Sequence, residues 1–191
     1  MKDIIISNIC KSYDNKLVLD NFSAILKTGE ITALMAPSGA GKTTLLRILM
    51  GFEKPDSGSI SGLDNIRIST VFQENRLCKR LDAIDNIRLV NSNISEDEAL
   101  KALENIGLGD SAYQKVEEFS GGMCRRVAIL RALMAEYDLL LLDEPFRELD
   151  IETKNIVMND TLKRCQGHTV LLVTHDASEL EAMGIKTCYK L

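Results

Sequence analysis

The sequence lacks any segment that would cross a membrane or direct the chain out of the cell. No apolar run approaches the length of about 18 residues that a membrane-spanning helix needs. The first residues, MKDIIIS, lack the basic, apolar and small-residue regions of a signal peptide. We therefore expect a cytoplasmic protein, and any membrane role must come through a partner.

Paired cysteines and an excess of basic residues are also missing. The cysteines, at positions 10, 78, 124, 165 and 188, lie far apart and form no C-x-x-C pair. Neither a zinc knuckle nor a disulfide framework is indicated, and a reducing compartment fits best. The formal net charge of -5 opposes non-specific attraction to nucleic acid, so we expect no nucleic-acid partner.

The composition that remains is that of an ordinary globular protein. Apolar residues make up 45% and charged residues 27% of the 191 residues. A chain of this length can bury a substantial core but has no room for a second complete domain. We therefore expect a single domain over residues 1–191.

The N-terminal third predicts strands followed by a helix. Apolar residues dominate positions 4–9 and alternate within 17–26, which predicts two paired strands joined near Asp14 and Asn15. Positions 31–35 have the pattern of a short buried strand, and positions 42–50 that of a helix.

The remainder predicts a helical insertion and then more strands. Residues 75–136 have helical patterns, and Ser95 with Glu98 forms a capping box. Two apolar strands, 139–142 and 169–173, enclose a helix over 151–164. Strand, helix, strand implies a parallel sheet. We expect an α/β fold with a mainly parallel sheet, an N-terminal antiparallel β lobe and an inserted helical subdomain.

The stretch MAPSGAGKTTLL joins a predicted strand to a predicted helix and fits a phosphate-binding loop, G-x-x-x-x-G-K-[ST], except at its first position. Its glycines let the backbone approach an anion, and the helix start presents free N–H groups. Lys42 would contact the β- and γ-phosphates, Thr43 would ligate Mg²⁺ and Thr44 would contact phosphate. A glycine-rich turn without a ligand is the alternative. The predicted nucleotide-binding residues are Ala36, Pro37, Ser38, Gly39, Ala40, Gly41, Lys42, Thr43 and Thr44.

Ala36 stands where the pattern has glycine. Pro37 biases the preceding residue to extended geometry, in which alanine has no steric penalty. Glycine is needed only if φ is positive there or if a Cβ would strike the loop. We expect the loop to work.

The run DLLLLDEP predicts a buried strand that ends in two carboxylates. Asp143 would hold Mg²⁺ through water, and Glu144 would act as general base on the attacking water. A cap of the next turn is the alternative role for Asp143.

The stretch FSGGM places Ser120, Gly121 and Gly122 at the start of a helix, another position that suits an anion. FSGGM resembles the LSGGQ signature of ATP-binding cassette (ABC) ATPases. Four other segments resemble motifs of that family, in the family's order: KSYDNKLVLDNFS resembles the adenine-stacking segment, VFQEN the glutamine loop, FRELD the D-loop and VTHD the switch histidine. The resemblance covers nearly the entire chain.

This resemblance implies a P-loop NTPase core at 1–74 and 137–191, a helical signature subdomain at 75–136, and ATP with Mg²⁺ as cofactors. Tyr13 would stack on adenine, Gln73 would contact Mg²⁺ and the attacking water, and His175 would contact the γ-phosphate. The alternatives are that Tyr13 only packs on the β lobe, that Gln73 is a polar strand end and that His175 has no ligand. His168 lies in a polar turn and has no predicted role.

The resemblance also implies a head-to-tail dimer, either of two copies or with a second ABC ATPase. The signature of one domain would close over the ATP of the other, and Asp150 would link the two sites. Met123 replaces the usual glutamine of the signature, and Arg147 and Glu148 replace small residues of the D-loop. These departures could alter dimer contacts or rate.

Residues 74–89 resemble the permease-docking region of bacterial importers of nitrate, sulfonate or taurine type; a solvated amphipathic helix is the alternative. The leading hypothesis is an ATPase subunit that powers transport through a separate integral membrane permease, with a substrate-binding protein if it is an importer. The alternatives are a nucleotide-binding ABC protein with weak or no hydrolysis, as in cell division, and a DNA-repair or translation ATPase.

Overall fold

The computed structural model describes residues 2–37 and 39–191. The chain forms two compact units. The first contains Met1–Ile68, Tyr137–Asp143 and Gly167–Leu191, and the second contains Ser69–Glu136 and Glu144–Gln166. The chain therefore passes between the units four times, once directly between Asp143 and Glu144.

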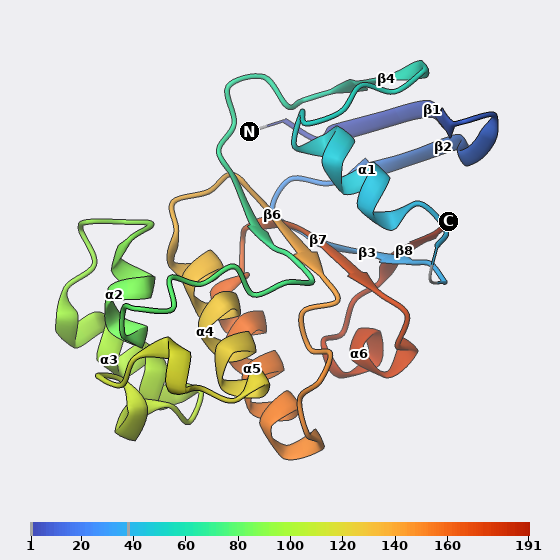
Figure 1. Ribbon diagram of the computed structural model, residues 1–191. Helices are drawn as coiled ribbons and strands as arrows, with labels where there is room; N and C mark the ends of the chain where they lie inside the picture. Colours follow the sequence, from blue (N-terminus) through green and yellow to red (C-terminus); the bar gives the residue numbers. More distant parts are fainter. Residues whose placement is uncertain (1, 38) are drawn as a thin grey trace. The chain divides into compact units, whose positions relative to one another are not determined.

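An antiparallel sheet opens the first unit (Figure 1). Its strands β1 (Ile4–Tyr13), β2 (Lys16–Leu26) and β4 (Ser57–Ser61) have the order β2-β1-β4. Asp14 and Asn15 connect β1 to β2 with φ values of 47° and 62°, the left-handed geometry that a two-residue hairpin needs. The predicted β lobe and its turn are confirmed.

The first unit also contains strands that pair in parallel in the order β6-β7-β3-β8. They are β3 (Ile31–Met35), β6 (Leu139–Asp143), β7 (Thr169–Thr174) and β8 (Thr187–Lys190). Every residue of β6 and β7 is buried, as expected for parallel strands covered on both faces. The predicted parallel sheet is confirmed.

Two helices complete the first unit, α1 (Lys42–Leu49) and α6 (Ala177–Ala182). Figure 1 shows α1 beside the antiparallel sheet. Leucines of α1 join one apolar core with residues of β1, β2, β3, β6 and β7. This shared core fixes the start of α1 relative to the ends of the parallel strands.

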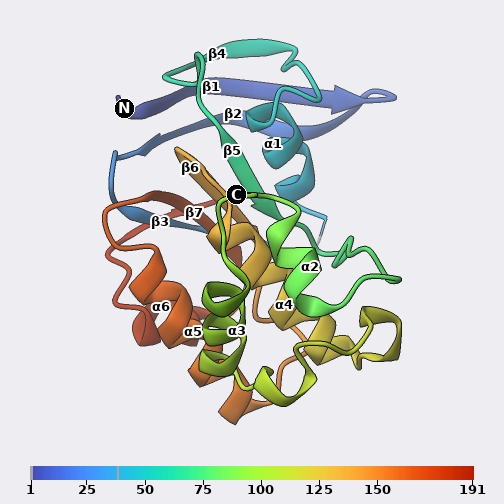
Figure 2. The same cartoon turned by 90° about the vertical axis from the view of Figure 1, so that its left-hand side faces the viewer.

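The second unit is mainly helical. Strand β5 (Ile68–Val71) leads into it, and helices α2 (Ala83–Arg88), α3 (Glu96–Asn105), α4 (Gly121–Met134) and α5 (Ile151–Arg164) follow, with short 3₁₀ turns at Gly109–Ser111 and Val116–Glu118. Helices α2, α3 and α4 contact one another, and α4 also contacts α5 (Figure 2).

The capping box at α3 is confirmed in detail. The Glu98 backbone N–H donates to Ser95 Oγ at 3.2 Å, and the Ser95 N–H donates to the Glu98 carboxylate at 2.9 Å. In residues 2–37 and 39–191, no helix combines the length and hydropathy needed to cross a bilayer.

Candidate functional site

Gly41 fixes the end of the predicted phosphate-binding loop, which runs from the end of β3 to the start of α1. It caps α1 with φ of 93°. A Cβ on this residue would lie 2.8 Å from both the Val18 carbonyl oxygen and Leu19 Cδ2. Both the backbone conformation and the close approach of β2 therefore require glycine here.

Gly39 has an equally left-handed backbone but a different environment. Its φ is 81°, and a Cβ placed on it meets no described atom within 4 Å. The loop is open on this side, which leaves space for an anion to approach the backbone. Ser38, the neighbouring predicted ligand, lies outside the described residues.

Ala36 occupies the first loop position without conflict. Among the described residues, it is not one of the non-glycine residues with positive φ. Its side chain is only 4% exposed, so the methyl group packs against protein rather than projecting into solvent. The backbone at this position therefore does not require glycine.

Lys42, the first residue of α1, lies folded over the loop. Its side chain is buried, and Nζ donates to the carbonyl oxygens of Ala36 at 3.0 Å and Pro37 at 3.4 Å. Thr44 is also buried, whereas Thr43 is exposed and available to a ligand. Within the described part of the loop, the Lys42 ammonium group is therefore held by backbone carbonyl groups, and Thr43 faces solvent.

Two further predicted residues follow neighbouring strands of the same sheet. Asp143 is the last residue of β6 and is 5% exposed, and His175 is exposed directly after β7. The phosphate-binding loop follows β3, which pairs with β7 in parallel. Carboxyl ends of parallel strands lie at one edge of a sheet, the usual ligand-binding edge of α/β folds. The fold therefore gathers Lys42, Asp143 and His175 at that edge.

Tyr13 ends β1 and is 42% exposed. Its hydroxyl donates to the Glu53 carboxylate, and Lys11 Nζ lies 5.6 Å from the ring centroid. Lys11 also pairs with Asp56 at 2.8 Å, and this hydrogen bond raises the pKa of Lys11. The ring is held at its hydroxyl end by Glu53, Lys11 lies over the ring, and the side chain remains partly exposed.

Glu144 belongs to the second unit although it directly follows Asp143. It is 5% exposed and has φ of 45°, a strained conformation for a side chain of this size. Such strain is frequent at active sites, where the surrounding structure maintains it. Arg147 Nη1 lies 3.8 Å from the Glu144 carboxylate.

Glu144 and Gln73 line one small cavity within the second unit, with a volume of about 40 Å³. That volume accommodates a water molecule. The predicted general base and the residue predicted to orient the attacking water are therefore brought to the same space. The cavity is lined by Gln73, Asn75, Arg125, Glu144, Arg147 and Glu148.

The signature segment begins α4 as predicted. Ser120 is the N-cap and accepts from the Met123 N–H at 3.3 Å. A Cβ on Gly121 would meet no described atom within 4 Å, and a Cβ on Gly122 would touch Leu149 only at 3.7 Å. The helix start is therefore open enough for another molecule to approach its backbone.

Asp150 caps α5, where its carboxylate accepts from the Thr153 N–H at 3.0 Å. This backbone hydrogen bond lowers the pKa of Asp150. The cap is a structural role that exists without a second subunit, and the predicted link across a dimer stays a prediction.

The residues of the first unit fit magnesium nucleotide. Magnesium prefers a few hard oxygen ligands, and a threonine hydroxyl and a carboxylate belong to that class. The exposed Thr43 hydroxyl and the carboxylate of Asp143 supply such oxygens, and the open side of Gly39 leaves space for phosphate. Among the described residues, no group of three or more His, Cys, Asp or Glu side chains is placed to hold a metal ion.

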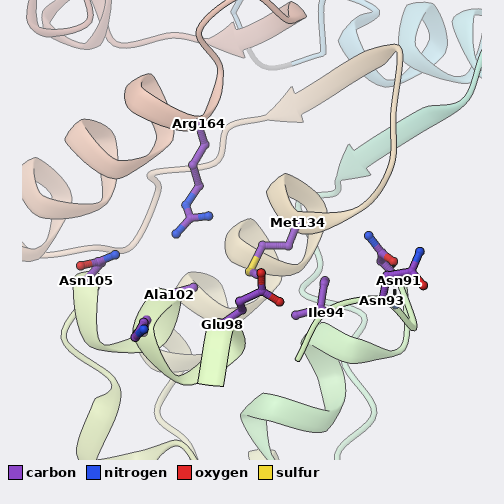
Figure 3. A pocket seen from close by; sticks show the side chains of 9 residues that line it. Asn91, Asn93, Ile94, Glu98, Ala102, Asn105, Met134 and Arg164 are labelled. Atoms are coloured by element: carbon purple, nitrogen blue, oxygen red, sulfur yellow. Dashed lines mark hydrogen bonds between the residues drawn. The ribbon is translucent and has the colours of Figure 1, made fainter. Parts of the chain in front are cut away.

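A larger cavity, about 380 Å³, lies between helices of the second unit and contains none of the predicted site residues. Figure 3 shows side chains of α3, α4 and α5 around it. Its volume alone does not connect it with nucleotide chemistry. It is lined by Asn91, Asn93, Ile94, Glu98, Lys101, Ala102, Asn105, Met134 and Arg164.

Two further residues, which the sequence patterns do not single out, hold the predicted site in place. Glu53 accepts the Tyr13 hydroxyl and lies 3.4 Å from Arg47 of α1. Arg125 of α4 is buried among backbone carbonyl groups of the glutamine loop and of the Glu144 turn. The sequence feature that could have identified Arg125 is a charged residue within the predicted helical segment.

Comparisons with known proteins agree with these motifs. Residues 19–147 match the model of the ABC transporter family. The spermidine/putrescine import ATP-binding protein PotA of Mesoplasma florum is 40% identical over 190 residues, which cover 90% of this chain and 54% of that protein. PotA of Spiroplasma citri is 41% identical over 190 residues, with the same coverage.

The aliphatic sulfonates import ATP-binding protein SsuB of Yersinia pestis is 42% identical over 190 residues, which cover 95% of this chain and 70% of that protein. The chain spans about half the length of the PotA relatives. The family model covers most of the chain and includes the phosphate-binding loop, the signature segment and Glu144. The chain therefore belongs to the ABC transporter ATP-binding family.

Proposed function

We propose that this chain is the ATP-hydrolysing subunit of a membrane transporter and powers substrate passage through a separate permease. The observation that carries the proposal is the cavity lined by both Gln73 and Glu144. A domain that only bound nucleotide would need the phosphate-binding loop but not a buried carboxylate beside a water-sized space. The import subunits among the relatives support the same conclusion.

ATP would bind through residues of the first unit. Tyr13 would stack on the adenine, and the loop N–H groups and the start of α1 would hold the phosphates. Lys42 Nζ would exchange its carbonyl acceptors, Ala36 and Pro37, for oxygens of the β- and γ-phosphates.

Magnesium would be held by Thr43, by Asp143 through water and by Gln73, and when bound it neutralises charge on the phosphates. The chain's own residues would do the rest. Glu144 would take a proton from the attacking water, whose oxygen forms the new bond to the γ-phosphorus while the bond to the β-phosphate oxygen breaks. Gln73 would orient that water, and His175 would contact the γ-phosphate.

The open start of α4 would complete the site of another copy or of a second ABC ATPase. Ser120, Gly121 and Gly122 would donate hydrogen bonds to the γ-phosphate of the nucleotide bound by the partner. Closure around ATP and release after hydrolysis would supply the mechanical step. The permease would dock beside residues 74–89, on the cytoplasmic face of the membrane, and an importer would also use a substrate-binding protein.

The transported substrate is not indicated by the relatives. PotA is named for polyamines, which are cations, and SsuB for sulfonates, which are anions, at nearly equal identity to this chain. The residues described here contact nucleotide, so they do not distinguish between those classes. The permease and binding protein would select the substrate.

Replacing Glu144 by glutamine tests the proposal. Glu144→Gln keeps the size of the side chain but removes the base, so ATP turnover should fall by about 10²- to 10⁴-fold. ATP binding should persist, because the phosphate-binding loop is unchanged, and gel filtration should detect an ATP-bound dimer. Phosphate release is measured with the chain assembled with its permease.

Glu104→Gln is the matched control, since Glu104 is an exposed carboxylate on α3 outside the cavity. It should leave turnover unchanged. Unchanged turnover in Glu144→Gln would exclude Glu144 as the base. ATP binding without phosphate release in the wild-type complex would instead favour a non-hydrolysing role.

A further inference from the structure

Arg125 is a buried cation in the first turns of α4. Its side chain is 4% exposed, and its guanidinium donates mainly to backbone carbonyl groups. Nε donates to Pro145 O at 2.7 Å, and Nη2 donates to Glu144 O at 2.7 Å. These two bonds hold the turn that carries the proposed base.

The third nitrogen of the same guanidinium binds the glutamine loop. Nη1 donates to Phe72 O, to Gln73 O at 3.2 Å and to Asn75 Oδ1 at 3.4 Å. One side chain on α4 therefore joins two segments that lie about 50 residues before it and about 20 residues after it in the sequence.

The geometry of arginine suits this task. Its guanidinium is planar and carries five N–H donors in a fixed fork, so it can serve acceptors on two sides at once. Lysine has three donors on a single atom and cannot span the same acceptors. Burial strengthens these charge-assisted bonds and makes the loss of their donor costly.

The Glu144 turn needs such support, because Glu144 has φ of 45° and a residue of this kind is strained there. Strained backbone persists only where its surroundings over-determine it. Arg125 binds the carbonyl of the strained residue and the next carbonyl along the chain. It therefore holds the conformation that presents the Glu144 carboxyl group to the cavity.

A second arginine of α4 extends the contact with the glutamine loop. Arg131 Nη2 donates to Arg76 O at 3.0 Å and to Asn75 O at 3.4 Å. The glutamine loop is thus bound along α4 at two points. Since Ser120 caps the same helix, the signature segment, the glutamine loop and the Glu144 turn belong to one hydrogen-bonded assembly within the second unit.

We propose that Arg125 is a positioning residue for ATP hydrolysis, which holds Gln73 and Glu144 in their working arrangement and ties both to the signature helix α4. The role rests on the proposed function of the site. Arg125 does not contact substrate in this role. Its loss lowers turnover and leaves nucleotide binding by the phosphate-binding loop intact.

Kinetics of the chain assembled with its permease test this role through three variants. Arg125→Met removes every donor while keeping a long side chain, and kcat should fall on the order of 10²-fold, the effect of a small misplacement of reacting groups. KM and the affinity for a nonhydrolysable ATP analogue should stay unchanged. Arg125→Lys should restore kcat only in part, because it retains the charge but not the fork.

Arg164→Met is the matched control. Arg164 also donates from Nε, to the Asp160 carboxylate at 2.7 Å, but it lies at the end of α5 and does not line the cavity that contains Gln73 and Glu144. Its loss should leave kcat unchanged. A fall in kcat equal to that of Arg125→Met would show a general effect of removing an arginine and overturn the assignment.

Hydrogen exchange of the variants gives a second readout that does not depend on turnover. In Arg125→Met, peptides covering residues 72–75 and 144–147 should exchange faster together, while peptides of β1 and β2 should not change. If Arg125→Met does not fold, Arg125→Lys is measured in the same way. Unchanged exchange in either segment overturns the proposed role.

The two proposals fail in different ways. Full activity of Glu144→Gln would refute the assignment of Glu144 as the base, but it would not affect the hydrogen-exchange result for Arg125. Loss of activity in Glu144→Gln together with full activity in Arg125→Met would refute the role of Arg125 alone.

Discussion

Replacing Ala36 by glycine restores the common phosphate-binding pattern, yet we expect it to weaken the protein without improving nucleotide binding. The Ala36 methyl group is 4% exposed, so its removal forfeits the burial of one carbon, about 0.8 kcal/mol. Glycine also gives the unfolded chain more freedom, which costs about 0.4–1 kcal/mol where the native φ suits alanine. The expected loss of unfolding free energy is therefore about 1–2 kcal/mol.

Nucleotide affinity should not change in Ala36→Gly. The described backbone at Ala36 does not have positive φ, and the methyl group is directed into the protein interior rather than into solvent. Urea denaturation gives the stability, and calorimetric titration with a nonhydrolysable ATP analogue gives the affinity. Ala33→Gly is the control: Ala33 is a fully buried residue of β3 outside the loop, so it should lose stability with the same unchanged affinity.

A tenfold gain in affinity for Ala36→Gly, with stability preserved, would refute this reasoning. It would mean that the Ala36 methyl group obstructs the nucleotide. The phosphate-binding loop would then have to rearrange on binding, and its conformation in the structure would not be the one that holds phosphate.

Two further predictions concern the loop and the cysteines. Gly41→Ala should destabilise the fold severely, because the new Cβ would lie 2.8 Å from atoms of β2. Gly39→Ala should retain most of its stability but lose nucleotide affinity. Denaturation and nucleotide titration of both variants test these expectations, and equal stability of the two variants would contradict them. Burial raises the pKa of Cys165 to about 12. At pH 8, iodoacetamide should therefore label the exposed Cys78 and Cys188 but not Cys165. Rapid labelling of Cys165 in the native protein, detected by peptide mapping, would contradict its burial.

Periodic sequence patterns were sufficient to predict the elements with strong local signals. The helix at Ile151–Arg164 and the strand at Ile31–Met35 have the predicted bounds. The strands β4 and β8 were not predicted, because SGSIS and TCYK are short and carry few apolar residues. They form because β1 and β3 offer unpaired edges, and such long-range pairing leaves little trace in a local pattern.

The residues of the candidate site also differ in how far the sequence alone predicts them. The phosphate-binding loop is continuous in sequence, so its order of glycine, lysine and threonine is visible directly. The support around Glu144 is not continuous, because Arg125 reaches it from another helix and reaches Gln73 from the opposite direction. The left-handed backbone of Glu144 also has no sequence signal, since glycine or asparagine is the residue expected at such a position.

In the proposed mechanism, Lys42 and Tyr13 of the first unit hold the nucleotide, whereas Glu144 of the second unit acts on the attacking water. A variant of Lys42 or Tyr13 should therefore lower affinity before turnover, and a variant of Glu144 should lower turnover at unchanged affinity. The backbone of Glu144 is hydrogen-bonded to α4 through Arg125, so the proposed base is held by the helix that carries the signature segment as well as by its chain connection to β6. Any event that shifts α4, such as closure over a partner's nucleotide or docking of a permease beside the glutamine loop, would move the base with it and thereby couple hydrolysis to assembly.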